Sequence, residues 1–316
     1  SWTRRIYGGA IHRAIRGVRE MLFSYFHLMP YIHMPEDYVE KLGTSWATIP
    51  NTYYDPELGH ELYNEYLDIL ERADELGFDA ICVNEHHQTA TCMVPSAPIM
   101  LGILARETKK ARLLILGNPI ANRKQPIRVA EEMAIIDVIS RGRLECGFVR
   151  GVPYEIAPAN AFPYRGTEKL WEAHDLILKA WTHHEGPFNF EGRWFHARQV
   201  NIWPRPFQQP HPPVWVTMGS AGSAVQVAQR QHVGAVFLAG YQNIRKIFDG
   251  YREGYLQAHG EEAPLDRLAY AALVYVGDNQ KKAEEGAERL LWYIRSNKVP
   301  PQFSNPPGYH PPQVAA

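Results

Sequence analysis

Four short segments of the chain place polar or glycine-rich residues directly after an apolar run. They are residues 84–87, 117–119, 149–151 and 218–223, which supply histidine, asparagine, arginine and serine side chains. The carboxyl ends of the strands of a parallel barrel meet at one face, where such side chains converge. If the apolar runs are neighbouring parallel strands, the four segments therefore form a single site.

The last of these segments has the features of an anion site. Gly219, Ser220, Ala221 and Ser223 form a turn that enters a predicted helix, where unpaired backbone N–H groups and the helix dipole favour an anion. Arg150, on the neighbouring predicted strand, can add a full positive charge. These residues predict a phosphate pocket. The alternative is a turn that only caps a helix and an arginine in a surface ion pair.

The adjacent histidines His86 and His87 follow Glu85, and two kinds of site are conceivable. Neighbouring side chains of an extended chain point to opposite sides, so only one histidine faces the site, as a proton carrier or as a hydrogen-bonded structural residue. A metal would need several converging histidine or carboxylate ligands. The next strand ends supply Asn118 and Arg150 instead, so we expect no metal. The Asn118–Pro119 peptide is expected to be trans, with cis as the alternative.

Strand-like and helix-like segments alternate from Met21 onward. Apolar runs predict strands at residues 22–26, 79–83, 112–116, 144–148, 213–218, 235–238 and 268–276. Apolar residues at helical spacing predict helices between them, such as residues 56–76, with start signals at Asp55 and Pro56 and a stop at Gly77. Residues 184–212 interrupt the alternation with prolines, glycines and aromatic residues, which predicts an insertion, with a hairpin as its candidate form.

Regular βα alternation over this length favours a parallel barrel over a doubly wound sheet. We therefore predict an α/β fold, a (β/α)8 TIM-type barrel. About seven βα units are recognisable and no eighth strand is evident after residue 297, so a barrel without its last βα unit is the alternative to a complete one. The expected parts are a basic extension at 1–20, the barrel at 21–296 and a proline-rich tail at 297–316.

Composition excludes several classes of protein. The 316 residues carry 33 basic and 34 acidic side chains, so charge gives no reason to expect binding to nucleic acid or to a membrane surface. No apolar stretch is long enough to cross a bilayer. The three cysteines, Cys82, Cys92 and Cys146, are too few and scattered for a disulfide framework, which favours a cytoplasmic location. The arginine-rich residues 1–20 are either a presequence or, as we prefer, an extension outside the fold.

The order of these motifs resembles the luciferase-like flavin-dependent monooxygenases. Residues 84–87 look like the family's Glu-His-His element, and residues 126–144 resemble its helix leading into the fourth strand. Residues 147–151 are similar to the segment whose arginine contacts the flavin phosphate, and residues 218–223 lie where the family completes the phosphate pocket. The similarity covers about residues 21–276; residues 122–125 are more basic than the family pattern.

The resemblance implies roles for individual residues. His86 would lie by the reactive face of the isoalloxazine ring and assist its oxygen chemistry or move a proton. Asn118 would hydrogen-bond the ring, and Arg150, Ser220 and Ser223 would hold the phosphate. The remaining expected cofactor contacts are Glu85, Met218, Gly219 and Ala221. The expected walls of the substrate pocket are residues 184–212 and His27, Met29, Trp46, Tyr53 and Tyr154, of which Trp46 and Tyr53 lie in a long loop that is a candidate lid.

The function that the resemblance implies is a two-component monooxygenase. It would use reduced FMN and O2 to oxidise a small organic substrate, with a separate flavin reductase that supplies the reduced FMN. A homodimer is the expected assembly. The alternatives are an F420-dependent dehydrogenase on the same barrel, a non-catalytic flavin-binding protein and, from another class, a metal-dependent hydrolase.

Overall fold

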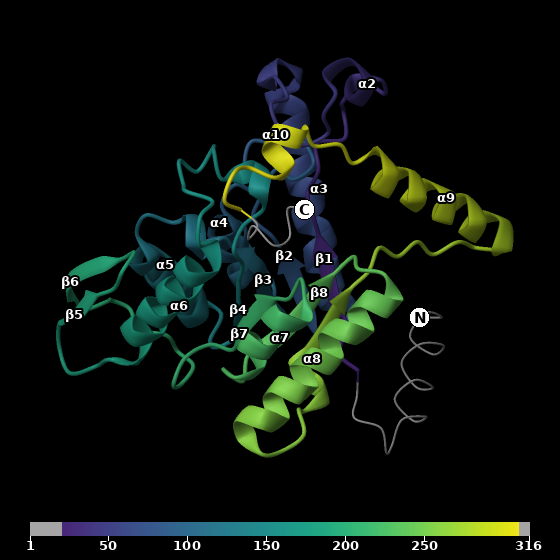
Figure 1. Ribbon diagram of the computed structural model, residues 1–316. Helices are drawn as coiled ribbons and strands as arrows, with labels where there is room; N and C mark the ends of the chain where they lie inside the picture. The colour runs from purple at the N-terminus through teal and green to yellow at the C-terminus, as the bar shows by residue number, and fades with distance from the viewer. Residues whose placement is uncertain (1–20, 310–316) are drawn as a thin grey trace.

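The computed structural model describes residues 21–309, in which seven parallel strands form one curved sheet (Figure 1). The strands, in their order across the sheet, are β1 (Ser24–His27), β2 (Ala80–Val83), β3 (Arg112–Asn118), β4 (Leu144–Phe148), β7 (Val214–Thr217), β8 (Val233–Phe237) and β9 (Leu268–Ala271). Sheet order equals chain order, so each strand pairs with the next strand of this sheet along the chain. The predicted α/β barrel architecture is confirmed.

A helix connects each strand to the next. The connecting helices are α3 (Pro56–Leu76), α4 (Ala97–Glu107), α5 (Pro126–Ile139), α6 (Gly166–Thr182), α7 (Ala221–Ala228) and α8 (Tyr241–His259). A short helix, α2 (Tyr38–Leu42), precedes α3, and α9 (Gln280–Ser296) and α10 (Pro301–Ser304) follow the last strand. Within residues 21–309, no helix is both long and apolar enough to cross a membrane.

Helix α3 illustrates why these elements form where they do. The Asp55 side chain caps the helix by accepting a hydrogen bond of 2.8 Å from the backbone N–H of Glu57, and Pro56 occupies the first helical position. Gly77 ends the helix in the left-handed conformation, with φ of 89°. The buried face carries apolar residues at helical spacing, namely Leu62, Tyr66, Leu70 and Ala73. The predicted bounds of this helix are confirmed.

The strand predictions differ from the structure mainly at the two outer strands. The last run, predicted to extend to residue 276, ends as a strand at Ala271, and Val274 and Val276 are exposed. Leu22 and Phe23 are also exposed, because β1 begins two residues later than predicted. Apolar sequence alone predicted burial, whereas an outer strand has a neighbour on one side only. The Asn118–Pro119 peptide is trans, and a cis peptide joins Leu116 to Gly117, at the register shift between β3 and β4.

The sheet is open between its first and last strands. Strand β9 pairs with β8 and β1 pairs with β2, and within residues 21–309 no strand lies between β9 and β1. Helix α9 projects away from the body (Figure 1). The seven units expected from the sequence are therefore confirmed, in the form without a last βα unit. The basic segment 1–20 lies outside the described residues.

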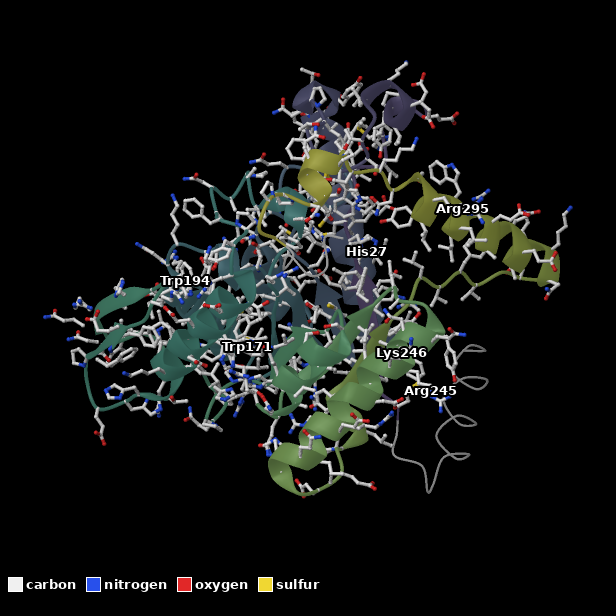
Figure 2. The ribbon with its side chains drawn as sticks, in the orientation of Figure 1. His27, Trp171, Trp194, Arg245, Lys246 and Arg295 are labelled. Carbon is white, nitrogen blue, oxygen red and sulfur yellow. The ribbon has the colours of Figure 1, made fainter. Side chains whose placement is uncertain are left out.

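Residues 184–212 contain the expected hairpin, formed by β5 (Phe188–Glu191) and β6 (His196–Val200). Glu172 of α6 anchors it by accepting hydrogen bonds of 2.7 Å from the backbone N–H groups of Trp194 and Phe195. The hairpin lies between a helix and the next strand, hence at the amino-terminal edge of the sheet. Trp194 accordingly lies well away from His27 at the end of β1 (Figure 2). The hairpin therefore lies at the opposite edge of the sheet from the turns that follow the strands.

Two buried histidines meet between α6 and the start of β8. The Nε2 atoms of His174 and His232 are 2.7 Å apart, so one ring donates a hydrogen bond and the other accepts it. Nδ1 of His174 lies 2.8 Å from a carboxylate oxygen of Asp175. The pKa of His232 is lowered to about 2, mainly because burial removes water from the charged ring and also because His174 lies beside it. Burial lowers the pKa of His174 as well. Both rings are therefore neutral at physiological pH.

This pair predicts a loss of stability in mild acid. Below the ordinary histidine pKa of 6.5, the unfolded chain binds a proton that folded His232 does not, so the free energy of unfolding falls by about 1.4 kcal/mol per pH unit for this group. Urea unfolding at about pH 7.5 and about pH 5.5 measures the slope. We expect His232→Asn to reduce the slope and His184→Gln, at an exposed position, to leave it unchanged. An unchanged slope in His232→Asn contradicts the prediction.

Candidate cofactor and active site

The carboxyl edge of the sheet brings the four polar segments together. They follow β2, β3, β4 and β7, which are consecutive neighbours in the sheet. Phe148 at the end of β4 pairs with Asn118 on one side and with Val216 on the other, so the turns after these strands start level with one another. The prediction that the four segments share one edge is confirmed.

His86 is held by a buried carboxylate. One oxygen of Glu155, Oε1, accepts hydrogen bonds from Nδ1 of His86 at 2.8 Å and from the backbone N–H of His87 at 3.0 Å. Glu155 is 3% exposed and ends the short turn η3 (Pro153–Glu155) after β4. Because an ionised carboxylate only accepts hydrogen bonds, Nδ1 of His86 donates to Glu155, and Nε2 is the ring nitrogen without a partner among residues 21–309. The second ring nitrogen is therefore available to take or give a proton.

Aromatic rings also lie beside His86. The Trp46 ring lies edge-on to His86, with centroids 5.0 Å apart, and the Tyr154 ring lies 5.2 Å from that of Trp46. Trp46 is 7% exposed. Burial raises the pKa of Tyr154, so its hydroxyl stays protonated. The imidazole thus lies in surroundings that restrict water.

His87 belongs to a second network. Its Nε2 lies 2.9 Å from Oε1 of Glu85, and Nη2 of Arg123 donates to the same oxygen at 2.5 Å. Nε of Arg123 reaches Oδ1 of Asn118 at 3.4 Å. Consecutive histidines therefore bind two different carboxylates, as expected for adjacent side chains that point to opposite sides. The groups of three or more His, Cys, Asp or Glu side chains that a metal requires do not occur within residues 21–309.

Two buried polar atoms in this network have no partner among residues 21–309. They are Oε2 of Glu85 and Nδ2 of Asn118, on residues that are 3% and 1% exposed. The carboxylate oxygen is an acceptor and the amide nitrogen is a donor. Buried polar atoms are almost always hydrogen-bonded, so this pair is complementary to a molecule with an N–H group beside a carbonyl oxygen.

The turn into α7 combines the two interpretations drawn from the sequence. Ser220 and Ser223 form a capping box, in which Oγ of Ser220 accepts from the backbone N–H of Ser223 at 3.2 Å and Oγ of Ser223 accepts from that of Ser220 at 3.0 Å. Oγ of Ser223 also lies 3.2 Å from the backbone N of Gly219. In the part of the chain described, the backbone N–H groups of Ala221 and Gly222 have no partner. Exposed backbone donors, rather than the hydroxyl groups, are therefore free for an anion.

Arg150 lies beside this turn, since β4 and β7 are paired. Its guanidinium carbon lies 3.9 Å from the centre of the Tyr309 ring, and its aliphatic stem lies against Gly166. It forms no ion pair within residues 21–309, so the surface ion pair considered above does not occur. Met218, in contrast, is 3% exposed and its side chain packs against Gly234 in the core.

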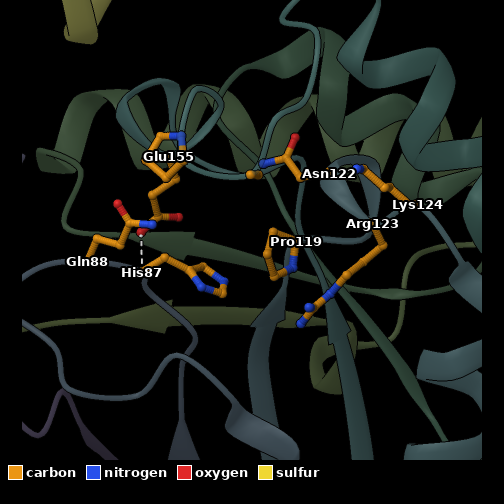
Figure 3. A pocket seen from close by; sticks show the side chains of 9 residues that line it. His87, Gln88, Pro119, Asn122, Arg123, Lys124 and Glu155 are labelled. Carbon is orange, nitrogen blue, oxygen red and sulfur yellow. Dashed lines mark hydrogen bonds between the residues drawn. The ribbon is translucent and has the colours of Figure 1, made fainter.

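A pocket of about 210 Å³ opens between the turns after β2, β3 and β4 (Figure 3). His87, Asn122, Arg123, Lys124 and Glu155 line it, together with proline and alanine residues. Its basic residues belong to the segment 122–125 noted in the sequence. The His87 ring points into the pocket, whereas the Arg123 head turns toward the sheet (Figure 3).

A family model described as luciferase-like monooxygenase matches residues 46–313. The chain belongs to this family. A flavin-dependent trigonelline monooxygenase, oxygenase component, from Acinetobacter baylyi is 28% identical over 242 residues, which are 75% of this chain and 65% of that protein. The chain therefore spans slightly less than two thirds of that relative's length.

Solved structures of luciferase-like enzymes share the fold. The oxygenating constituent of 3,6-diketocamphane monooxygenase from Pseudomonas putida, in complex with FMN, has a TM-score of 0.69 at 18% identity and covers 87% of this chain and 76% of its own. An F420-dependent secondary alcohol dehydrogenase in complex with an F420–acetone adduct has a TM-score of 0.66 at 16% identity, covering 92% and 80%. Proteins of this fold thus include both flavin and F420 enzymes.

Of the residues expected to line the substrate pocket of this luciferase-like protein, two lie beside His86 and the other three lie elsewhere. Trp46 and Tyr154 lie together beside the candidate catalytic histidine. His27 ends β1, where its Nδ1 accepts a hydrogen bond of 3.0 Å from the backbone N–H of Met29, and burial lowers its pKa. Met29 itself is 0% exposed and lies in the core. Tyr53 lies in η1 (Asn51–Tyr53), without a hydrogen bond or ring contact to Trp46 or Tyr154 in the described chain.

Sequence reasoning missed Glu155, and it noted Arg123 only as part of the basic segment 122–125, without its contact to Glu85. Both lie in loops after strands, where no periodicity predicts the direction of a side chain. The sequence offered one signal for each: Glu155 follows Arg150 by five residues, and Arg123 follows Asn118 by five residues. Because the four strand ends share one edge, both side chains can reach the histidine pair.

Arg123 predicts a test of the buried network. Arg123→Ala removes the charged partner of Glu85, and we expect the free energy of unfolding to fall by about 1–3 kcal/mol, because the buried carboxylate keeps only the His87 contact. The double variant Glu85→Gln/Arg123→Ala should recover part of this loss. Urea unfolding provides the measurement, with Lys124→Ala, an exposed neighbour, as control. A loss in Arg123→Ala no larger than in the control contradicts the ion-pair interpretation.

Proposed function

We propose that this chain is the oxygenase component of a two-component monooxygenase that uses reduced FMN and O2 on a small organic substrate. A separate flavin reductase would supply the reduced FMN. The observation that carries the proposal is the pair of unpartnered buried atoms, Oε2 of Glu85 and Nδ2 of Asn118, on the network beside His86. The family membership supports it.

The groups on Glu85 and Asn118 fit the ring of a flavin. The pyrimidine edge of an isoalloxazine ring carries an N–H group flanked by carbonyl oxygens. Oε2 of Glu85 can accept from the N–H group, and Nδ2 of Asn118 can donate to a carbonyl oxygen. Arg123 would hold the carboxylate in place through its ion pair.

The phosphate would bind one strand further along the same edge. The free backbone N–H groups of Ala221 and Gly222 and the guanidinium of Arg150 are the donors, while Ser220 and Ser223 hold the turn in shape through the capping box. This assignment gives the two serines a different role from the one expected from the resemblance. Gly219 would contribute a backbone position without steric obstruction, since a Cβ there would contact nothing within 4 Å.

Bound reduced FMN would supply the activation of O2, and the protein would supply proton management and exclusion of water. Nε2 of His86 would give or take the proton at the reacting centre, because Glu155 fixes the proton on Nδ1. Trp46 and Tyr154 would shield that nitrogen from water. The aromatic walls suit a largely apolar substrate.

An F420-dependent dehydrogenase is the second candidate. It is favoured by the structural similarity to the F420-dependent alcohol dehydrogenase, whose TM-score is close to that of the FMN-binding monooxygenase. In that reaction His86 would serve as the base or acid for a substrate hydroxyl group, and O2 would have no role. A non-catalytic flavin-binding protein remains an outcome of the test below.

Anaerobic titration with reduced FMN and, separately, reduced F420, followed by air, tests the proposal. We expect FMN to bind, and the rate of its reoxidation in air to change at least about tenfold in His86→Ala, because a positioned proton donor is lost. Glu155→Gln should shift the pH profile of that rate without weakening FMN binding. His184→Gln is the control.

Each other outcome of this titration has a defined meaning. If F420 binds and FMN does not, the protein is a dehydrogenase and the monooxygenase proposal is wrong. FMN binding with a reoxidation rate that is unchanged in His86→Ala favours a non-catalytic flavin-binding protein, and binding of neither cofactor contradicts all three.

We also infer a homodimer through the outer face of α4 and α5. Adjacent helices here expose large apolar side chains, at Ile99 and Ile103 on α4 and at Ile135, Val138 and Ile139 on α5. Contiguous apolar patches of this kind are typical of protein interfaces. A two-fold axis would let this face pack on itself.

Sedimentation velocity tests the dimer. Ile139→Lys should shift the protein toward a monomer, because a buried unpaired charge opposes association. Leu291→Lys, an exposed apolar position on α9, serves as the matched control and should sediment as the wild type does. If Ile139→Lys sediments as the wild type, the proposed face is not the interface.

A further inference from the structure

The segment that follows α9 crosses the carboxyl edge of the sheet. We call residues 297–309 the C-terminal strap. It begins with reciprocal hydrogen bonds to the loop after β1: the backbone N–H of Ser45 donates to the carbonyl oxygen of Lys298 at 2.8 Å, and the backbone N–H of Lys298 donates to Oγ of Ser45 at 2.8 Å. Helix α10 (Figure 1) belongs to the strap. It packs against η3, which carries Glu155. The strap therefore spans from the first strand to the turn after β4.

The strap ends on the candidate phosphate-binding arginine. The Tyr309 ring covers one face of the Arg150 guanidinium at 3.9 Å, and its carbonyl oxygen lies 3.5 Å from Nη1 of that arginine. The Tyr309 hydroxyl donates to the carbonyl oxygen of Gly151 at 3.0 Å, which fixes the ring in this position. The Arg150 stem also passes Gly166, where a Cβ would approach Cδ of the arginine to 3.0 Å. Arg150 is thus held from several directions.

We propose that Tyr309 is a positioning residue for Arg150 and that the C-terminal strap completes the phosphate end of the cofactor site. This inference rests on the proposed function. A guanidinium binds a phosphate through its edge, by two parallel N–H groups, whereas an aromatic ring binds its face. Nε and Nη2 of Arg150 have no hydrogen-bond partner among residues 21–309, so one edge is open. Tyr309 and a phosphate can therefore bind the arginine together.

These contacts hold Arg150 in its binding conformation before the cofactor binds, an effect known as preorganisation. An arginine side chain loses considerable rotational freedom when it binds a ligand, and this loss weakens binding. With the ring, the carbonyl oxygen and the Gly166 contact in place, Arg150 has lost that freedom before the cofactor arrives. Tyr309 should therefore strengthen binding of a phosphorylated flavin without any contact to the flavin ring.

Comparison of FMN with riboflavin isolates this effect, because the two ligands differ only in the phosphate. Anaerobic titration of the full chain with reduced FMN and reduced riboflavin, followed by protein fluorescence, should show FMN affinity reduced about three- to tenfold in Tyr309→Ala, the range expected for loss of a cation–π contact. Riboflavin affinity should be unchanged. Tyr309→Phe keeps the ring and should retain most of the affinity, and Gln302→Ala, at an exposed position of the same strap, should behave as the wild type.

The double variant Arg150→Ala/Tyr309→Ala links the two residues. Once Arg150 is absent, the loss of Tyr309 should weaken FMN no further. Equal weakening of FMN and riboflavin in Tyr309→Ala would mean that the strap supports the ring site only, and tighter FMN binding would mean that Tyr309 competes with the phosphate; either result overturns the proposal. Failure of the wild-type chain to bind FMN and riboflavin would instead contradict the proposed function.

Discussion

Glu155 places one carboxylate oxygen between two consecutive histidines, where the turns after β2 and β4 meet. A buried carboxylate is unfavourable unless it receives hydrogen bonds, and here the donors are the His86 ring and the His87 backbone. The same contact therefore stabilises the chain and fixes which nitrogen of His86 carries the proton. Because α10 packs on the turn that carries Glu155, the C-terminal strap also depends on this position.

The second carboxylate, Glu85, organises the inner side of the site in a related way. Arg123 and His87 both bind one of its oxygens, and the other oxygen is left over. A protein that retains such an unpartnered atom bears a cost in stability, which is reasonable where a ligand completes the network. The two carboxylates thus differ: one oxygen of Glu155 receives two hydrogen bonds from the histidine segment, whereas Glu85 keeps a buried oxygen without a partner among residues 21–309.

Sequence reasoning predicted what depends on periodicity and on strand order. Helix α3 followed from its cap, its apolar spacing and Gly77, and the shared edge followed from four polar turns after apolar runs. The unpredicted features depend on loop geometry and on contacts between distant segments. No local pattern indicates that Glu155 turns toward His86, that Met29 is buried in the core or that Tyr309 lies on a residue more than 150 positions earlier in the chain. The turn before α7 allowed two interpretations, a helix cap and a phosphate site. The hydrogen bonds of the structure show that the Ser220 and Ser223 hydroxyl groups cap the helix, so that only backbone N–H groups remain free.

The position of the β5–β6 hairpin has a consequence for how the protein can vary. The hairpin is attached to α6 through Glu172 and lies in a helix-to-strand connection, at the end of the sheet opposite the candidate site. The length and composition of the hairpin can change, or a reporter domain can be inserted there, without a change in the geometry around His86. Differences between related chains would therefore accumulate at this end of the sheet, so the length of the hairpin says little about the chemistry at the opposite edge.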